Sequence, residues 1–331
     1  MYKQFYKLRR NPFEITPDPS FLFLTRRHKE ALAALYHGVR RRKGFVVLTG
    51  EVGTGKTLLI RCLLKLLKGS DVSCAYVFNS RLSPLEFLQF IAVDLGLPVA
   101  GKNKAEILHE LCNFVSARHQ RKLTTLVIVD EAHHLPTEAL EEVRLLTNLE
   151  TAQQKMLQIL LAGQPEFAGK LDSFELRQLK QRVALRSHLK PLDLDETIGY
   201  VRRRLQLAGA GEQADIFPED TIAKIHRHAR GIPRVINTIC ENALITAYAR
   251  QMHKIPAGII EEVADDLCLG VASSPAMQTG RGSDEVLNAV RTLLELHSHL
   301  QGTAELARPS LAPGLDLSHI ERDSLKPTIK I

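Results

Sequence analysis

The chain has 331 residues, 44% of them hydrophobic and 24% charged, and a formal net charge of +7 at pH 7; this length allows two domains, and the charge permits an anionic partner without requiring one. The five scattered cysteines form no C-x-x-C pair, which argues against a zinc site or a disulfide framework. The N-terminus lacks the apolar core of a signal peptide and no run approaches the roughly 18 apolar residues of a membrane helix, so a cytoplasmic protein is expected, with a peripheral position at the inner membrane as the alternative.

The first 191 residues contain short apolar runs that alternate with helical patterns. Residues 1–25, with several aromatic side chains and prolines, are expected to form an ordered strap rather than a helix. Strands are predicted at 44–50, 74–80, 124–130, 156–163 and 182–192, and helices at 27–43, 57–68, 84–96, 104–119 and 137–150. The alternation predicts an α/β nucleotide-binding domain over 1–191, with a five-stranded parallel sheet between two helical layers.

The pattern changes after residue 191, where no further strand is predicted. Four helices are expected at 193–209, 217–230, 233–251 and 256–268, which together predict a small all-α lid domain over 192–270. From 271 to 331 the composition shifts to Ser, Gly, Pro and Thr, and a largely flexible tail is expected. One amphipathic helix is predicted there near 284–300, for partner docking, oligomer contact or a solvated surface.

The stretch "GEVGTGKT" at 50–57 matches the phosphate-binding loop pattern G-x-x-x-x-G-K-S/T and lies between a predicted strand and a predicted helix. Its glycines allow backbone N–H groups to turn toward phosphates at the positive end of the helix. Lys56 is expected to reach the β- and γ-phosphates of ATP, and the Thr57 hydroxyl to bind Mg²⁺. The predicted nucleotide-binding residues are Gly50, Glu51, Val52, Gly53, Thr54, Gly55, Lys56, Thr57 and Leu58.

The stretch "VIVDEAHHL" at 127–135 supplies two carboxylates where a buried strand ends. Ligands of open α/β sheets bind at such carboxyl ends, so Asp130 is expected to hold Mg²⁺, largely through water. Glu131 is expected to polarise the attacking water. His133 and His134 are interpreted as surface or packing residues without a catalytic role. The letters also spell a helicase DEAH box, but the second ATP-binding domain of such a helicase is missing after residue 190.

Five further polar residues are candidates for this site or for that of a neighbouring subunit. Gln164 follows the fourth strand and is expected to contact the γ-phosphate and orient the water; the alternative is a loop amide that bonds the backbone. Arg234 opens a lid helix from which it could reach the phosphates. Arg177, Arg182 and Arg186 precede the lid, where one of them could act as an arginine finger in a neighbouring subunit or simply lie on a solvated helix face.

These motifs together resemble AAA+ ATPases over about residues 1–268, and more narrowly the secretion-type ATPases of the ExeA/GspA family. The narrower resemblance is carried by "FYKLRRNPFEITPDPSFLFLTRRHKEALAAL", "GFVVLTGEVGTGKT" and "LAGQPE". It implies strand order 5-1-4-3-2, Arg234 as the second sensor, and ATP bound between subunits of a ring or filament. It also implies Arg182 as the preferred finger and Arg177 as the second choice.

The resemblance implies an ATP-driven oligomeric motor or switch that serves a secretion, pilus or polysaccharide-export system. Members that act in secretin assembly carry a membrane helix and peptidoglycan-binding modules; neither is found in this sequence, so no direct role at the cell wall is expected. The alternative is a DNA-binding regulator similar to the TniB, TnsC and MuB transposition proteins, with "RRRK" at 40–43 and "VRRRL" at 201–205 in a DNA groove. A nucleotide switch with negligible turnover is a third reading, against which Glu131 argues.

Overall fold

A computed structural model describes residues 2–14, 16, 18–78, 81–211 and 215–269 of the chain. The tail over 271–331, with its predicted helix near 284–300, lies outside the described residues. The strands are β1 Phe45–Gly50, β2 Val72–Val77, β3 Thr124–Val129, β4 Leu157–Gly163 and β5 Val183–Leu189. The helices are α1 Tyr2–Phe5, α2 Arg26–Arg40, α3 Lys56–Leu67, α4 Pro84–Asp94, α5 Lys104–Gln120, α6 Thr137–Leu146, α7 Pro165–Leu171, α8 Arg177–Gln181, α9 Leu194–Leu207, α10 Glu219–Ala229, α11 Pro233–Ala249 and α12 Ala257–Asp266, with 3-10 turns η1 Pro19–Phe21 and η2 Ala132–His134.

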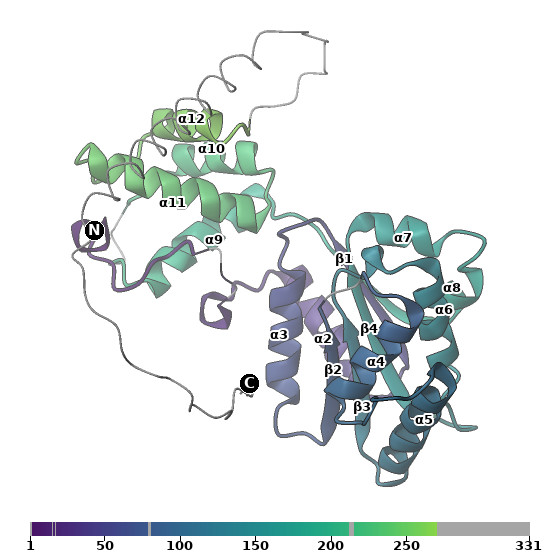
Figure 1. The fold of residues 1–331 in the computed structure, drawn as a ribbon. Helices are drawn as coiled ribbons and strands as arrows, with labels where there is room; N and C mark the ends of the chain where they lie inside the picture. The colour runs from purple at the N-terminus through teal and green to yellow at the C-terminus, as the bar shows by residue number, and fades with distance from the viewer. Residues whose placement is uncertain (1, 15, 17, 79–80, 212–214, 270–331) are drawn as a thin grey trace, which may run out of the picture. The chain divides into compact units, whose positions relative to one another are not determined.

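The five strands form one parallel sheet in the order β2-β3-β4-β1-β5. This is the order 5-1-4-3-2 implied by the resemblance, and the prediction of a five-stranded parallel sheet is confirmed (Figure 1). β1, β3 and β4 lie inside the sheet and are almost continuously buried, as expected for strands covered on both faces. β2 and β5 lie at the two edges and are more exposed.

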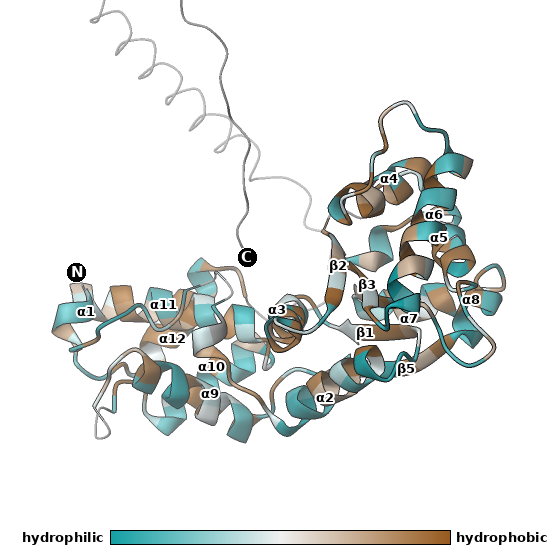
Figure 2. Cartoon of the chain, turned by 90° about the horizontal axis from the view of Figure 1, so that it is seen from below, coloured by the Kyte–Doolittle hydropathy of each residue, from teal (hydrophilic) through white to brown (hydrophobic). Residues whose placement is uncertain are grey.

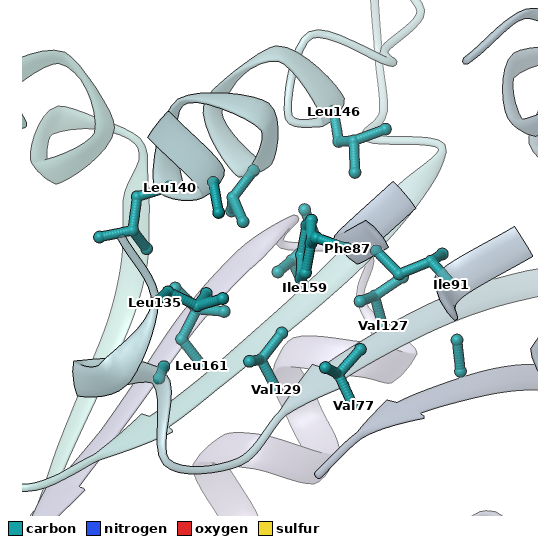
Figure 3. Packing of buried hydrophobic residues seen from close by; sticks show 14 of the residues in the cluster. Val77, Phe87, Ile91, Val127, Val129, Leu135, Leu140, Leu146, Ile159 and Leu161 are labelled. Atoms are coloured by element: carbon teal, nitrogen blue, oxygen red, sulfur yellow. The ribbon is translucent and has the colours of Figure 1, made fainter. Parts of the chain in front are cut away.

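Helices cover both faces of the sheet, because successive strand residues point to opposite sides. On one face, α2 and α3 pack Leu35, Ile60 and Leu63 against Leu48 and Ile128. On the other face, α4 to α8 pack over the alternate strand residues. Figure 3 shows Phe87, Ile91, Leu140 and Leu146 pointing toward Val127, Val129, Ile159 and Leu161. The three-layer arrangement therefore follows from the alternation of side chains along the strands.

Helices α9 to α12 bury a hydrophobic cluster of their own, which the N-terminal segment completes. Tyr2, Tyr6, Phe13 and Phe21 all belong to this cluster, so the aromatic side chains of the strap pack against the lid helices rather than the sheet. The strap also contains two short helical turns, α1 and η1, where none was predicted. The boundary between the two domains at residue 191 stays a prediction. The strap, predicted as part of the first domain, packs its aromatic side chains against the lid helices of the second.

The ends of several helices are set by local side chains. Ser83, Asn103 and Asp193 each accept a hydrogen bond from the backbone N–H of the third residue of α4, α5 and α9. That residue is a glutamate in each helix, and its carboxylate accepts a hydrogen bond from the backbone N–H of the cap residue. Such capping boxes are sequence-local, which explains why the predicted helix starts lie close to the observed ones. α7 and α8 have no predicted counterpart, because seven and five residues are too few for a repeating apolar pattern.

The hydropathy of the residues follows this layering: in Figure 2 the ribbon of β1 is coloured brown, for hydrophobic residues, and the helices around it carry both brown and teal residues. Within the described residues, no helix is both long and apolar enough to cross a membrane.

The two faces of α3 provide a direct test of this packing. Leu63 is fully buried under the sheet, whereas Leu66 on the same helix is 55% exposed. Leu63→Ala should lower the free energy of unfolding by about 2–5 kcal/mol, because it removes buried methyl groups and leaves a cavity. The control Leu66→Ala should change it by less than about 0.5 kcal/mol. Urea denaturation measures both; equal effects would contradict the assignment of the buried face.

Candidate functional site

The loop between β1 and α3 has a backbone that only glycine adopts easily. Gly53 and Gly55 have positive φ angles of 81° and 100°. A Cβ atom on Gly53 would lie 2.6 Å from Cβ of Arg234, the second residue of α11. The backbone N–H of Arg234 also donates to the Gly53 carbonyl, with a donor–acceptor distance of 3.3 Å. The absence of a side chain at Gly53 therefore allows the lid helix to approach the loop.

Lys56 lies under this loop, with 5% of the residue exposed. Its Nζ donates to the carbonyl oxygens of Gly50 and Glu51 at 2.8 and 3.1 Å. Burial lowers the pKa of Lys56, and the carboxylates of Glu131 and Asp130 oppose that shift. A cleft lies above Lys56 and is lined by five other residues of the predicted loop: Val52, Gly53, Gly55, Thr57 and Leu58. The Thr54 side chain instead donates a hydrogen bond to the Glu51 carbonyl.

Thr57 and Asp130 come together although they are far apart in the sequence. Thr57 Oγ1 donates to Asp130 Oδ2 at 2.7 Å, and the backbone N–H of Glu131 donates to Oδ1 at 3.0 Å. The Tyr76 hydroxyl, on the neighbouring strand β2, also donates to Oδ2 at 3.0 Å. Burial, followed by the Asp130 carboxylate, raises the pKa of Tyr76. A hydroxyl and a carboxylate at this distance are the oxygen ligands that Mg²⁺ prefers.

Tyr76 belongs to this site, although no motif of the sequence marks it. Its signal lies in the parallel sheet: β2 pairs with β3, with Tyr76 in register with Ile128. A polar side chain near the end of the strand beside the carboxylate strand is therefore placed close to Asp130. Without the strand order, that neighbour relationship cannot be read from the sequence.

Glu131 and Gln164 follow the adjacent strands β3 and β4, and His133 lies between them. Glu131 has a left-handed backbone, with φ at 52°. Its Oε2 lies 3.4 Å from His133 Nδ1, and Gln164 Nε2 lies 2.9 Å from His133 Nε2. Glu131 lines the cleft, whereas Gln164 is not among the lining residues. Gln164 is connected to Glu131 through the imidazole ring of His133. His133, interpreted above as a surface or packing residue, is thus in contact with two of the predicted catalytic residues.

A cleft of about 390 Å³ extends from the loop to the lid helices and the strap. Arg234 lines it, together with Arg204 and Tyr200 of α9. Arg204 is only 6% exposed, and its guanidinium donates to the Pro12 carbonyl at 2.5 Å and to the Tyr200 hydroxyl at 2.9 Å. The structure thus adds a buried cation to the cleft residues, and it removes Arg204 from the exposed basic run that "VRRRL" suggested. Within that run Arg202 is paired with Glu219, with 2.6 Å between Nη2 and Oε1.

The three finger candidates lie away from the cleft of their own chain. Arg182 Nη1 donates to the Thr147 hydroxyl at 3.1 Å, and the Arg177 guanidinium stacks over the exposed Phe174 ring with 4.2 Å to the centroid. Arg186 is on the edge strand β5, at an exposed position. None of the three is among the residues that line the described cleft.

His28 supports the loop from below. Its Nε2 lies 3.3 Å from the Thr54 carbonyl oxygen and its Nδ1 2.8 Å from the Thr25 hydroxyl. Since a carbonyl can only accept, Nε2 carries the proton and Nδ1 accepts from Thr25. Burial lowers the pKa of His28, against the raising effect of the Thr54 hydrogen bond, so the neutral ring is the form that fits.

Comparison with known proteins is consistent with this geometry. Residues 39–171 match the family model of the AAA domain. General secretion pathway protein A of Aeromonas hydrophila is 42% identical over 286 residues, which cover 85% of this chain and 51% of that protein, so the chain spans about half the length of this relative. The Mu-like prophage FluMu DNA transposition protein B of Haemophilus influenzae is 37% identical over 97 residues, 29% of this chain and 31% of that protein.

The fold itself occurs in a solved structure of the Aeropyrum pernix ORC2 protein. The two chains superpose with a TM-score of 0.58 at 20% identity, over 81% of this chain and 75% of that one. The resemblances stated from the motifs, to AAA+ ATPases and to the ExeA/GspA type, are confirmed.

The buried His28 predicts a specific pH dependence of stability. Because its pKa is lower in the folded than in the unfolded chain, the unfolded chain binds the proton first as the pH falls. The free energy of unfolding should therefore decrease below about pH 6.5. His28→Gln keeps an N–H group near Thr54 but does not titrate, so it should lose less stability than the unmodified protein between about pH 7.5 and 5.5. Urea denaturation at both pH values measures this; an equal loss in both proteins would contradict it.

Proposed function

We propose that the protein binds ATP with Mg²⁺ and hydrolyses it. The premise is that residues 39–171 match the AAA domain and that most of the chain resembles General secretion pathway protein A. The observation that carries the proposal is the 2.7 Å hydrogen bond between Thr57 and Asp130. It joins the phosphate-loop helix to the carboxylate strand at the mouth of a cleft that Lys56, Glu131 and Arg234 also line. The ORC2 structure that shares the fold is a complex with ADPNP and ADP.

Each residue of the cleft has a proposed task in binding. The loop N–H groups and the start of α3 bind the phosphates, and the positive end of the helix favours their charge. Lys56 exchanges its hydrogen bonds to loop carbonyls for the β- and γ-phosphates. Arg234, held beside Gly53, binds the γ-phosphate from the lid side. Thr57 and Asp130 hold Mg²⁺, which when bound supplies positive charge that offsets the charge of the phosphates.

Hydrolysis requires a water placed in line with the γ-phosphate. Glu131 lines the cleft at the carboxyl end of β3 and accepts a hydrogen bond from this water, which polarises it. Gln164, at the adjacent strand end, orients the same water or the γ-phosphate through its amide. The leaving ADP oxygen gains negative charge, which Lys56 and a cation from another subunit stabilise.

That second cation is proposed to come from a neighbouring copy of the chain. Arg182 is the preferred finger and Arg177 the second choice, because both lie away from the cleft of their own chain. A ring or filament of identical subunits would bring them to the adjacent cleft. We propose that this homo-oligomer acts as a motor or switch for a secretion, pilus or polysaccharide-export assembly, from a cytoplasmic position.

Two substitutions separate binding from hydrolysis. Lys56→Ala should abolish ATP binding, whereas the control Lys65→Ala, an exposed lysine of the same helix, should leave it unchanged. Glu131→Gln should retain ATP binding and lower turnover by about 10²–10⁴-fold, since it removes the base that polarises the water. Nucleotide titration and phosphate release with Mg²⁺ measure these effects. Turnover near the unmodified level in Glu131→Gln would show that another group activates the water.

A second candidate function, ATP-dependent DNA binding, is favoured by a basic hollow at the amino ends of β1 and β3. Arg40, Arg41, Arg42 and Lys122 line it, with His119, Gln120 and Gln154, and its volume is about 700 Å³. Arg42 is held in place by bonds to the Lys122 carbonyl at 2.7 Å and Gln154 at 3.2 Å. None of its lining residues is acidic, and its cations come from two segments that are distant in the sequence. Such a hollow fits a phosphodiester backbone through charge rather than through base stacking.

The salt dependence of binding tests this candidate. Arg40→Ser, Arg41→Ser and Lys122→Ser combined should weaken binding to a duplex of any sequence and reduce the slope of log K against log salt by about 2–3. Arg202→Ser and Arg203→Ser, in the other basic run, serve as the control and should leave the slope unchanged. Fluorescence anisotropy at about 50–200 mM salt measures this. No binding at low salt, or equal binding by the triple variant, would exclude this hollow as the DNA site.

A further inference from the structure

His133 lies between the two residues proposed to control the attacking water. It stands in η2, directly after β3, with 12% of its side chain exposed. One ring nitrogen faces the Glu131 carboxylate at 3.4 Å and the other faces the Gln164 amide nitrogen at 2.9 Å. The ring therefore spans from Glu131, two residues after β3, to Gln164, the residue after β4.

The position of the ring proton follows from these two neighbours. An amide N–H₂ group can only donate, so His133 Nε2 accepts from Gln164 and the proton of the neutral ring is on Nδ1. Nδ1 faces the carboxylate of Glu131, which can only accept. With the amide reversed, the proton would move to Nε2 and a lone pair would face the carboxylate. The arrangement with Nδ1–H toward Glu131 is the one that is favourable on both sides.

The neutral ring also suits the charges around it. Burial is the largest cause that lowers the pKa of His133, and the ring of His134 is the second. Lys56 also lowers this pKa, whereas Glu131 and Glu166 raise it. The His134 ring lies with its centroid 3.9 Å from that of His133. Lys170 of α7 donates to the His133 carbonyl at 3.3 Å, which holds the backbone of this turn.

From this geometry we infer that His133 is a positioning residue: it couples the amide of Gln164 to the carboxylate of Glu131, so that a change at one is transmitted to the other. The inference rests on the proposed ATPase function. Gln164 keeps its second N–H and its carbonyl oxygen for the γ-phosphate or the water. A displacement of Gln164 toward the γ-phosphate would pull on Nε2 and move Nδ1–H relative to Glu131. The His133 side chain would thereby make the orientation of the Glu131 carboxylate depend on whether the γ-phosphate is bound.

Two single variants test the role of the ring. His133→Ala should lower kcat for ATP hydrolysis by about 10–100-fold, the usual cost of removing a supporting hydrogen bond. KM and the Kd for ATP should stay within about threefold, because the ring does not line the cleft. The neighbouring His134→Ala removes a ring that contacts His133 but leaves Glu131 and Gln164 on either side of His133, so it should lower kcat much less than His133→Ala. His133→Asn, whose amide replaces Nδ1–H but cannot reach Gln164, should restore part of the lost kcat.

A double-mutant cycle with Gln164→Ala tests the coupling itself. If the ring transmits the position of Gln164, the double variant should be little slower than the slower single variant, because each substitution breaks the same link. Multiplying effects, with the two losses in kcat independent, would overturn the inference. The inference would also be overturned if His133→Ala had the same kcat as the unmodified protein. It would be overturned as well if His133→Ala lowered kcat/KM only by weakening ATP binding, with kcat unchanged.

The failure of this inference is distinguishable from failure of the proposed function. If the unmodified protein shows no phosphate release that depends on Lys56, the ATPase proposal itself is wrong. If the unmodified protein hydrolyses ATP and Lys56→Ala abolishes this activity, the results for His133 bear on the coupling alone. Urea denaturation of His133→Ala checks that the variant is folded under assay conditions.

Discussion

The hydrogen bond from Thr57 to Asp130 is the contact on which the candidate site depends. It joins the first turn of α3 to the end of β3, two segments more than 70 residues apart in the sequence. Parallel strands with helical crossovers bring all their carboxyl ends to one edge of the sheet, so loops from β1, β3 and β4 meet there. The fold therefore gathers the glycine-rich loop after β1, the adjacent carboxylates Asp130 and Glu131 after β3 and the Gln164 amide after β4, three segments that are far apart in the chain.

The lid and the strap complete this site through a buried cation. Arg204 is almost fully buried, and its nearest partners are carbonyl and hydroxyl oxygens and aromatic rings: Pro12, Tyr200 and the ring of Phe21 at 4.8 Å. A buried charge is costly unless it is paired or its hydrogen bonds are satisfied. The strap therefore does more than cover a surface, because its carbonyl groups hold an arginine that lines the cleft.

Two sequence patterns changed meaning once they were placed in the fold. The letters "DEAH" spell a helicase box, but the surrounding sequence favours a pair of carboxylates followed by two histidines without a catalytic role. In the fold the first of these histidines, His133, contacts both Glu131 and Gln164. The two basic runs looked equivalent, but one contains the buried Arg204 and the paired Arg202, whereas the other joins Lys122 at a hollow. Both differences are tertiary: they depend on which element packs beside the run.

The sequence by itself determined the sheet, most helices and the central loop of the site, because strand runs, capping boxes and the glycines of the loop act over a few residues. The strand order came from the resemblance and agrees with the structure. Only the tertiary structure decided the roles suggested for Tyr76, His133 and Arg204, and it separated the two basic runs. Each of these depends on a partner far away in the chain, and a hydrogen bond across a sheet edge leaves no periodic signal in the sequence. Local rules therefore predict where polar groups stand along the chain, and packing decides which of them meet.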